Sequence, residues 1–396
     1  MNESQYYKEL SKCVRCGACK ALCPTYLSTL DETMGARGRI AMLGALRKNE
    51  LTPTKNLSDK IFSCILCGAC EDLCPTGINI PETIYEGRAQ LKDHYRRGRL
   101  LAKIMKSSLS KTNTFFSVLR GLQKFIYPTL YKAGRLRYIP AMAPSPFKKN
   151  AQVYKNKKKI GRIVIFAGCS VNYFYPHLGD SLIHILMAKG YEVIVLSGEI
   201  CCGAPMRSLG FKKEAVTMAK KNIELFNKLN TEAILCMCPT CTMTIKKQYP
   251  IITGETIEKI MDVNEFFIKD KTIQNLKTGP RVVTYHDPCH LRYGLGIKNE
   301  PREILKGIQG IKFVEMQNAG DCCGFGGFFS QNFKELSKTI GKKKINSICN
   351  TSADTVVTSC PGCMMQLEGI KNETGAEIDI MHIVEIIYEA MQGEKI

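Results

Sequence analysis

The stretch Asp321-Cys322-Cys323-Gly324-Phe325-Gly326-Gly327 places two adjacent cysteines before a glycine, and Cys201-Cys202-Gly203 has the same arrangement. Each pair has one cysteine upstream and a Cys-x-x-Cys motif downstream, at nearly the same distances. The first set is Cys169, Cys201, Cys202, Cys238 and Cys241, and the second set is Cys289, Cys322, Cys323, Cys360 and Cys363. The two sets are offset by 120 to 122 residues, which indicates an internal duplication.

The N-terminal part of the chain carries another repeat, in which every cysteine recurs 51 residues later. Its copies are Cys13-x-x-Cys16-Gly17-x-Cys19-x-x-x-Cys23-Pro24 and Cys64-x-x-Cys67-Gly68-x-Cys70-x-x-x-Cys74-Pro75. Three closely spaced cysteines bind one [4Fe–4S] cubane, and the fourth, before proline, reaches the other cubane. We therefore expect one cubane on Cys13, Cys16, Cys19 and Cys74, and the other on Cys64, Cys67, Cys70 and Cys23. Zinc is the alternative, but it favours separated Cys-x-x-Cys pairs over a run of four.

The chain has 396 residues, 20 cysteines and a formal net charge of +20. This length is enough for roughly two to four domains with ample cores. Residues 1–5 lack the features of a secretory signal, and no apolar run approaches the roughly 20 residues that span a bilayer. We therefore expect a cytoplasmic protein whose cysteines bind metal rather than form disulfides. Peripheral attachment to the inner face of a membrane is an open alternative.

The patterning predicts four segments and an α+β multidomain fold. The segments are 1–95, a helical di-cluster ferredoxin domain; 96–160, a basic helical connector and linker; 161–275, a first Cys-Cys-Gly domain; and 276–396, a second. In the last two segments short apolar runs alternate with helical patterns, which predicts tandem α/β domains with parallel sheets. Binding groups in such sheets gather beyond the carboxyl ends of the strands. Four cysteines are expected there, namely Cys169, Cys238, Cys289 and Cys360.

Apolar periodicity gives the individual elements. The expected strands are 162–166, 191–196, 233–237, 281–285, 311–316 and 355–359. The expected helices are 39–46, 81–95, 100–122, 178–189, 212–229, 301–307 and 331–348.

Adjacent cysteines point in different directions along an extended chain and suit an ordinary tetrahedral site poorly. They suit a cluster in which one thiolate bridges two irons. Both sets resemble the Cys-Cys-Gly domains of heterodisulfide reductase catalytic subunits and of glycolate oxidase iron–sulfur subunits, and the resemblance covers nearly the whole chain. The segment Met34-Gly35-Ala36-Arg37-Gly38-Arg39-Ile40 also resembles the glycolate and lactate oxidase branch.

The resemblance implies two noncubane [4Fe–4S] clusters, because all ten cysteines of the two sets are present. Members of that family with complete sets split a disulfide there in two one-electron steps. By the same resemblance Cys202 and Cys323 are candidate catalytic residues, with His290 as a donor of hydrogen bonds or protons. The alternatives are zinc or vicinal disulfides at the cysteine pairs, and a packing role for the histidine.

Other residues carry less chemistry. Cys236 and Cys349 are expected to be small buried side chains rather than ligands. His286 flanks Cys289, as His290 does, and has the same possible roles. His177, His184 and His382 lie in helical patterns and are expected to be structural. Gly326-Gly327 lacks the full dinucleotide fingerprint.

No flavin motif is present, so hydride chemistry would need FAD in a separate flavoprotein subunit. The segment from His94 to Lys159 has 17 Lys and Arg and no acidic residue. A solvated face, a surface for anionic lipid and a docking site for an acidic partner subunit remain open for it. Nucleic acid is excluded as a partner, because nothing resembling a base-reading module accompanies the charge.

Two functions fit these features. The first is an electron-transfer subunit that takes electrons from a glycolate- or lactate-type dehydrogenase and passes them to a quinone or another acceptor. The second is a catalytic thiol–disulfide reductase of the heterodisulfide reductase type. A zinc-stapled scaffold without redox activity is the third alternative, and it predicts a colourless protein.

Overall fold

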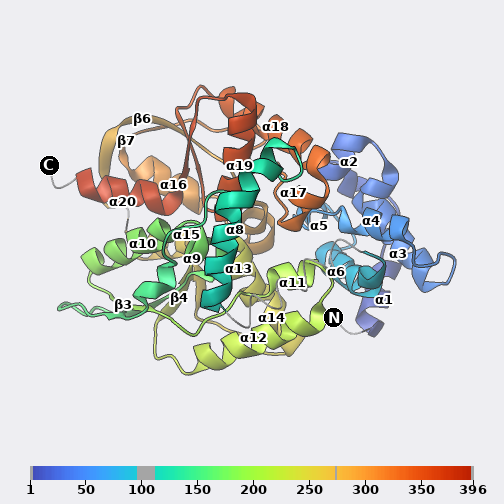
Figure 1. The fold of residues 1–396 in the computed structure, drawn as a ribbon, viewed down its shortest axis with the longest axis horizontal. Coiled ribbons are helices and arrows are strands. Elements are labelled where there is room, and N and C mark those ends of the chain that lie inside the picture. The colour runs from blue at the N-terminus through green and yellow to red at the C-terminus, as the bar shows by residue number, and fades with distance from the viewer. Residues whose placement is uncertain (1–2, 96–111, 273, 394–396) are drawn as a thin grey trace.

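The computed structural model describes residues 3–95, 112–272 and 274–393 of the chain. The N-terminal helices lie at one end of the long axis, and two sheets with their covering helices form the remainder (Figure 1). The predicted helix 100–122 lies partly outside the described residues. Its described part belongs to α8, Thr112–Lys132. In the described part of the chain, no helix is both long and apolar enough to cross a membrane.

The N-terminal module is helical, as predicted. Its elements are α1 (Glu3–Ser11), η1 (Ala18–Lys20), α2 (Pro24–Thr29), η2 (Glu32–Met34), α3 (Ala36–Arg47), α4 (Lys55–Phe62), α5 (Ala69–Asp72), α6 (Ile80–Leu91) and η3 (Lys92–His94). α6 begins where Asn79 Oδ1 accepts a hydrogen bond from the Glu82 amide, at 3.1 Å, with Pro81 in the first turn. α3 buries Ile40 and Leu43 on the face that packs against α1 and α6.

The first sheet has the strand order β1-β3-β2-β4-β5. Its strands are β1 (Val153–Tyr154), β2 (Arg162–Phe166), β3 (Glu192–Val195), β4 (Ala233–Cys236) and β5 (Ile260–Asp262). The helices around it are α9 (Gly168–Tyr173), α10 (Pro176–Lys189), α11 (Ala204–Ser208), α12 (Lys212–Asn227), α13 (Pro239–Met243), the π-helical η5 (Thr244–Gln248), α14 (Tyr249–Thr253) and α15 (Val263–Lys269). β2 to β5 pair in parallel, so this sheet confirms the predicted βαβ units.

The second sheet has the order β7-β6-β8-β9, with every pairing parallel. Its strands are β6 (Lys277–Tyr285), β7 (Gln309–Phe313), β8 (Thr355–Thr358) and β9 (Asp379–His382). Its helices are the π-helical η6 (His290–Leu295), α16 (Glu300–Gly307), α17 (Phe328–Asn332), α18 (Lys334–Cys349), α19 (Pro361–Thr374) and α20 (Ile383–Gly393). This order matches β3-β2-β4-β5 of the first sheet, as a duplication requires.

Some elements differ from the sequence expectation. β1 lies inside the segment expected to be a connector, together with η4 (Phe147–Asn150), and it adds an antiparallel edge strand to the first sheet. β5 and β9 were not predicted, because each is only three or four residues long and lacks a distinctive apolar run. The helix expected over 331–348 is divided between α17 and α18.

The N-terminal module is attached to the first sheet domain by a buried ion pair. Glu82 on α6 and Arg207 on α11 form two parallel hydrogen bonds, one of them 2.8 Å long between Glu82 Oε1 and Arg207 Nη1. Both side chains are about 5% exposed or less. Nearby, Arg88 donates a hydrogen bond to the Ser208 carbonyl at 2.8 Å. Charge pairing therefore aligns two segments that are more than a hundred residues apart in sequence.

We predict that Glu82→Gln destabilises the protein by about 3–5 kcal/mol, because it leaves the buried Arg207 charge without a carboxylate. Urea unfolding under anaerobic conditions measures the shift. Glu224→Gln, which breaks the exposed pair with Lys228, is the matched control and should leave the unfolding midpoint unchanged. Equal effects of the two substitutions would contradict the structural role of the buried pair.

Candidate metal centres

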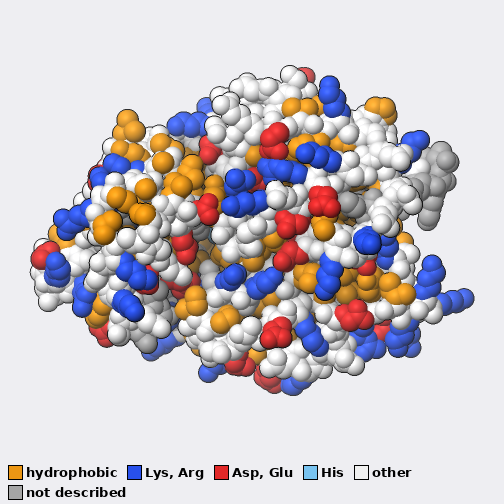
Figure 2. Space-filling model, turned by 180° about the vertical axis from the view of Figure 1, so that it is seen from behind, with side chains coloured by type: hydrophobic (Ala, Val, Ile, Leu, Met, Phe, Trp, Pro, Cys, Tyr) orange, Lys and Arg blue, Asp and Glu red, His pale blue; other side chains and the backbone are white. Residues whose placement is uncertain are grey.

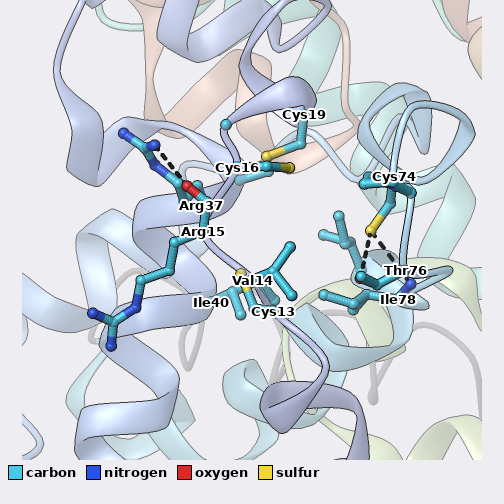
Figure 3. Close-up of a pocket in the computed structure, with 14 residues that line it drawn as sticks. Cys13, Val14, Arg15, Cys16, Cys19, Arg37, Ile40, Cys74, Thr76 and Ile78 are labelled. Carbon is cyan, nitrogen blue, oxygen red and sulfur yellow. Dashed lines mark hydrogen bonds between the residues drawn. The ribbon is translucent and has the colours of Figure 1, made fainter.

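Four cysteines from both copies of the N-terminal repeat surround one hollow. Figure 3 shows Cys13, Cys16 and Cys19 on one side of this hollow and Cys74 facing them from the other copy. These residues are the set that the sequence assigns to one cubane. Cys16 is exposed, so this hollow opens at the protein surface.

A second hollow is lined by Cys23, Cys64, Cys67 and Cys70, the other predicted set. Cys67 and Cys70 are buried, and burial raises the pKa of both thiols well above the ordinary value. The fourth cysteine of each copy thus faces the hollow of the other copy. The geometry supports the exchanged assignment, which we carry forward as a proposal.

The two cysteine loops repeat the same backbone conformation. Gly17 and Gly68 have φ values of 89° and 81°, and Arg15 and Leu66 have φ values of 57° and 63°. A non-glycine residue in the left-handed region is uncommon and costs energy, so its recurrence 51 residues later marks a required geometry. This conformation lets three cysteines of a short loop converge on one point.

Hydrogen bonds to sulfur also recur in the two copies. Thr76 Oγ1 lies 3.4 Å from Cys74 Sγ, and Thr25 Oγ1 lies 3.4 Å from Cys23 Sγ. The Ile78 amide donates to Cys74 Sγ at 3.5 Å. Burial raises the pKa of Cys74, but the hydrogen bonds from Thr76 and from backbone amides outweigh burial and lower it overall. Such bonds stabilise the thiolate form that binds metal.

Two buried arginines near the second hollow indicate whether it suits an iron–sulfur cluster, because a buried positive charge needs a negative charge close by. Arg39 is 1% exposed, lines this hollow, and donates hydrogen bonds to neutral groups, namely Lys60 O, Thr25 Oγ1 and Ser63 Oγ. Arg88 donates to the Phe62 and Cys64 carbonyls. Neither has a carboxylate ion-pair partner among the described residues. Buried cations need a counter-charge, and four metal-bound thiolates supply one, so the residues present fit a [4Fe–4S] cluster.

The first Cys-Cys-Gly site is a connected group of five thiols. Neighbouring thiols perturb one another's pKa values along this group: Cys169 interacts with Cys201, Cys201 with Cys202, Cys202 with Cys241 and Cys241 with Cys238. Hydrogen bonds from Cys201 and Cys241 lower the pKa of Cys202 to about 5. Cys169 and Cys238 follow the carboxyl ends of β2 and β4, as the sequence predicted.

The second Cys-Cys-Gly site repeats this arrangement. Cys289 contacts Cys322, and Cys323 Sγ lies 3.4 Å from Cys363 Sγ, which in turn contacts Cys360. Hydrogen bonds from Cys322 and Cys363 lower the pKa of Cys323 well below the ordinary value. Cys289 and Cys360 follow the carboxyl ends of β6 and β8, again as predicted.

The sites lie next to one another. Cys238 of the first Cys-Cys-Gly site lies close enough to Cys360 of the second for the two thiols to interact, which raises the pKa of Cys238 and lowers that of Cys360. Cys289 of the second site is close enough to Cys67 of the second hollow for their charges to interact. Thiols therefore lie next to one another from the second hollow, through the second Cys-Cys-Gly site, to the first.

His290 joins three of these sites. Its Nε2 lies 3.1 Å from the Leu66 carbonyl oxygen, so Nε2 carries a proton that it donates there. Its Nδ1 then accepts a hydrogen bond from Thr240 Oγ1 at 2.8 Å. Both ring nitrogens are thus engaged in holding loops together, and a catalytic role for His290 stays a prediction.

His286, unlike His290, does not use its ring nitrogens to hold loops together. It is completely buried, neither ring nitrogen has a partner of regular hydrogen-bond geometry in the described part of the chain, and the imidazole lowers the pKa of Cys323. A ring nitrogen and the sulfurs of Cys323 and Cys363 all lie within 4.8 Å of one another. The geometry therefore favours His286 over His290 as the histidine that faces the second Cys-Cys-Gly site.

The remaining cysteines and histidines lie outside the sites. Cys236 ends β4 and is fully buried, as expected, whereas Cys349 is exposed at the end of α18, so its predicted burial is wrong. Cys349 is at the last position of the helix, where the chain leaves the core. His177 pairs with Glu385 and His382 Nε2 contacts the Met237 carbonyl oxygen, which is consistent with structural roles.

The sequence analysis missed the buried cations. Arg39, Arg88 and Lys344 are each 4% exposed or less, although such side chains are almost always exposed. Aligning the two Cys-Cys-Gly sets residue by residue identifies Lys344, because it interrupts the apolar face of a helix. No comparable sequence signal marks the two arginines.

Comparisons with known proteins agree with this architecture. Residues 9–78 match the family model of a 4Fe-4S dicluster domain, and residues 163–246 and 283–368 each match that of a cysteine-rich domain. A solved structure, a hypothetical protein from Helicobacter pylori, has a TM-score of 0.54 at 12% identity, and the match covers 99% of this chain and 73% of that one. The fold and its cysteine sites define an iron–sulfur protein.

Curated relatives specify the family. An "Uncharacterized iron-sulfur protein" of Methanococcus maripaludis is 30% identical over 90% of this chain and 67% of its own length. A "Probable glycolate oxidase iron-sulfur subunit" of Bacillus subtilis is 28% identical over 96% of this chain and 94% of its length. A heterodisulfide reductase subunit of Methanosarcina acetivorans is 26% identical over 97% and 94%. The chain belongs to this family of iron–sulfur proteins with Cys-Cys-Gly domains.

We predict that Cys74→Ser removes the cluster bound by Cys13, Cys16 and Cys19, and spares that of its sequence neighbour Cys70. Electron paramagnetic resonance of the reduced protein distinguishes the two. The spectrum of Cys74→Ser should match that of Cys13→Ser and differ from that of Cys70→Ser. A spectrum that matches Cys70→Ser instead would overturn the exchanged assignment.

Proposed function

We propose that this chain is the iron–sulfur electron-transfer subunit of an oxidoreductase complex. It takes electrons from a flavoprotein subunit of the glycolate or lactate dehydrogenase type, which holds the FAD, and passes them to a quinone or another acceptor. The two [4Fe–4S] cubanes and two noncubane clusters would supply one-electron steps when bound. The Bacillus subtilis relative, a probable glycolate oxidase iron-sulfur subunit, supports a hydroxyacid dehydrogenase as the electron donor.

One observation carries the proposal: the thiol sites adjoin one another from the protein surface to its interior. Cys16 is exposed, while Cys70 interacts electrostatically with Cys19 and so links the two hollows. The pairs Cys67–Cys289 and Cys238–Cys360 then connect the deeper sites. A structural zinc scaffold has no need for four metal sites placed in sequence, whereas electron transfer does.

The surface around the first hollow suits a partner subunit. Val14, which lies between two cysteines of the loop that lines this hollow, is 66% exposed. Arg37 holds the loop by donating a hydrogen bond to the Arg15 carbonyl at 3.0 Å, as Figure 3 shows. Exposed apolar groups beside a cluster are the anchors that a docking flavoprotein would cover.

Anaerobically purified protein is expected to contain about 16 iron atoms per chain, because four clusters of four irons are proposed. With a copurified flavoprotein, glycolate or lactate should bleach the visible absorbance of these clusters. About 8 iron atoms per chain in undamaged protein would mean that only the two cubanes are present and that the Cys-Cys-Gly sites hold no cluster. Full iron loading without reduction by any hydroxyacid in native extract would overturn the assignment of the electron donor.

A second candidate function is thiol–disulfide reduction at the paired Cys-Cys-Gly sites. The observation that favours it is the contact between two complete sites through Cys238 and Cys360. A disulfide held there would meet two one-electron donors. The name of the Methanosarcina acetivorans relative supports this alternative.

On this second candidate function, Cys323→Ala should abolish disulfide reduction while both cubane signals remain. Loss of Cys323 removes a thiolate of low pKa from the site, whereas the cubane ligands lie in another module. Turnover with a candidate disulfide and paramagnetic resonance with the corresponding thiols measure the two properties. Cys349→Ala, at an exposed cysteine outside the sites, is the matched control. Retained turnover in Cys323→Ala would remove this site from the mechanism.

We also propose that α8 attaches the protein to an anionic membrane surface. Val118, Leu122, Phe125 and Ile126 are 47–75% exposed, and their spacing places them on one face of the helix. The opposite face packs on residues 137–144, where Gln123 Nε2 donates to the Pro140 carbonyl at 2.8 Å. Arg120 lies on this packed face, where its Nη1 donates to the Pro144 carbonyl at 2.9 Å, whereas the Lys124 side chain is exposed; a basic group near anionic lipid contributes about 1 kcal/mol.

The exposed apolar stripe, rather than the charge, favours lipid over an acidic protein partner, because an acidic surface would leave Val118, Leu122, Phe125 and Ile126 without an apolar contact. On the face opposite to the view of Figure 1, Lys and Arg side chains are interspersed with Asp and Glu (Figure 2). The segment from His94 to Lys159, by contrast, has no acidic residue to repel a phosphate surface. Some of its basic residues are paired elsewhere, as Arg137 is with Glu373 and Lys148 with Glu199, but an exposed apolar stripe beside exposed basic side chains is typical of helices that lie in a membrane interface.

Vesicle cosedimentation tests this attachment. The protein should bind phosphatidylglycerol-rich vesicles more strongly than phosphatidylcholine vesicles, and Phe125→Ser should weaken binding about tenfold. Ile251→Ser, at an exposed apolar residue elsewhere, is the control. Undiminished vesicle binding by Phe125→Ser would overturn the proposal. Binding of the apolar stripe of α8 to a purified partner subunit, without binding to vesicles, would also overturn it and would show that the stripe is a protein contact.

A further inference from the structure

The two Cys-Cys-Gly domains bury corresponding residues on corresponding helices. Six positions of α12 and α18 match at an offset of 122 residues. The pairs are Ala215 and Ser337, Met218 and Ile340, Ala219 and Gly341, Asn222 and Lys344, Ile223 and Ile345, and Phe226 and Ile348. Only one pair differs in charge: a neutral amide in the first domain corresponds to an amine in the second.

Both members of this pair hold the loop that leads to the adjacent cysteines. Asn222 Nδ2 donates to the Ile200 and Cys201 carbonyls, each at 3.3 Å, and Oδ1 accepts from the Ile200 amide. Lys344 Nζ donates to the Asn318 carbonyl at 2.7 Å and to the Ala319 carbonyl at 3.2 Å. Since a neutral amide suffices in the first domain, bracing of the loop does not explain the positive charge in the second.

The Lys344 charge has no carboxylate partner. Its side chain is 2% exposed, and no ion pair joins it to an acidic residue in the part of the chain that the structure describes. Burial lowers the pKa of Lys344, while Asp321, the Cys323 and Cys322 thiolates and Asp287 act in the opposite direction, although neither aspartate forms an ion pair with it. An unpaired buried cation is strongly unfavourable, so a nearby anion is required. The adjacent cysteines are where that anion would lie.

We propose that Lys344 is the counter-charge of the second Cys-Cys-Gly site and makes that site accept an electron more readily than the first. This rests on the proposed function, because both sites must hold clusters. Adding an electron makes a cluster more negative, and a buried cation a short distance away stabilises that form. Net charge and hydrogen bonds to sulfur are the properties that set the reduction potential of such clusters.

A second difference acts in the same direction. His286 occupies the position that Phe166 occupies in the first domain, three residues before Cys289 and Cys169 respectively. The phenyl ring cannot donate a hydrogen bond, whereas the imidazole has an N–H that is not used elsewhere in the described chain. The second site is also the one that adjoins the second hollow through Cys67 and Cys289. It is therefore both the nearest and the more favourable electron acceptor of the pair.

Redox titration followed by paramagnetic resonance tests the inference on iron-loaded full-length protein. Lys344→Gln keeps an amide that can hold the loop and removes the charge, so the midpoint potential of the second site should fall. Lys344→Arg should retain the native potential. Lys342→Gln, at an exposed lysine on the same helix, should not shift it, because solvent screens surface charge. The Cys202→Ser background removes the first site and makes the assignment of the signal unambiguous.

The reciprocal substitution, Asn222→Lys, should raise the potential of the first site in a Cys323→Ser background. If Lys344→Gln loses iron from the second site, the potential of Asn222→Lys still shows whether a charge at this position raises the potential of the adjacent site. If neither Lys344→Gln nor Asn222→Lys shifts the potential while the native chain holds about 16 irons, the inference about Lys344 is wrong and the proposed function still stands. About 8 irons in the native chain would instead show that the proposed function fails at the Cys-Cys-Gly sites.

Discussion

The balance of buried charge is the constraint on which the rest of the structure depends. Eighteen cysteines converge on four sites inside one chain, and thiolates that bind metal there would carry negative charge into regions of low dielectric constant. Arg39, Arg88 and Lys344 are buried beside these sites with neutral hydrogen-bond partners and without a carboxylate ion pair in the described chain. Each side of this arrangement is unfavourable alone, so the cations and the metal sites stabilise one another.

The two parallel sheets bring together cysteines that are far apart in the sequence. Parallel strands end at one edge, so cysteines that follow β2 and β4, or β6 and β8, are brought together without long loops. The two sheet domains then place these edges against each other, where Cys238 meets Cys360. The duplicated domains thus form a paired site, and its halves differ at Asn222/Lys344 and Phe166/His286, where the second half has an amine and an imidazole.

The N-terminal module adds a path to the surface. Its first hollow opens at Cys16, and its second is packed against the second Cys-Cys-Gly site through Ile65, Cys67 and Cys322. The buried Glu82–Arg207 pair and the contact of His290 with Leu66 fix the module against both sheet domains. Electron transfer depends steeply on distance, so on the proposed function these attachments would hold the sites at the separations that it needs.

The sequence by itself determined the spacing of the cysteine sets, the duplication and most strands and helices, and it predicted the exchange of the fourth cysteines between the N-terminal copies. These features were predictable because they depend on spacing and on local apolar periodicity, as in β2, α10 and α12. Only the tertiary structure decided that Cys238 meets Cys360, that Cys67 adjoins Cys289, and that Lys344 is buried without an acidic partner. Those properties arise from packing between residues far apart in the chain, and no local pattern specifies how separate domains are oriented or which charges they enclose.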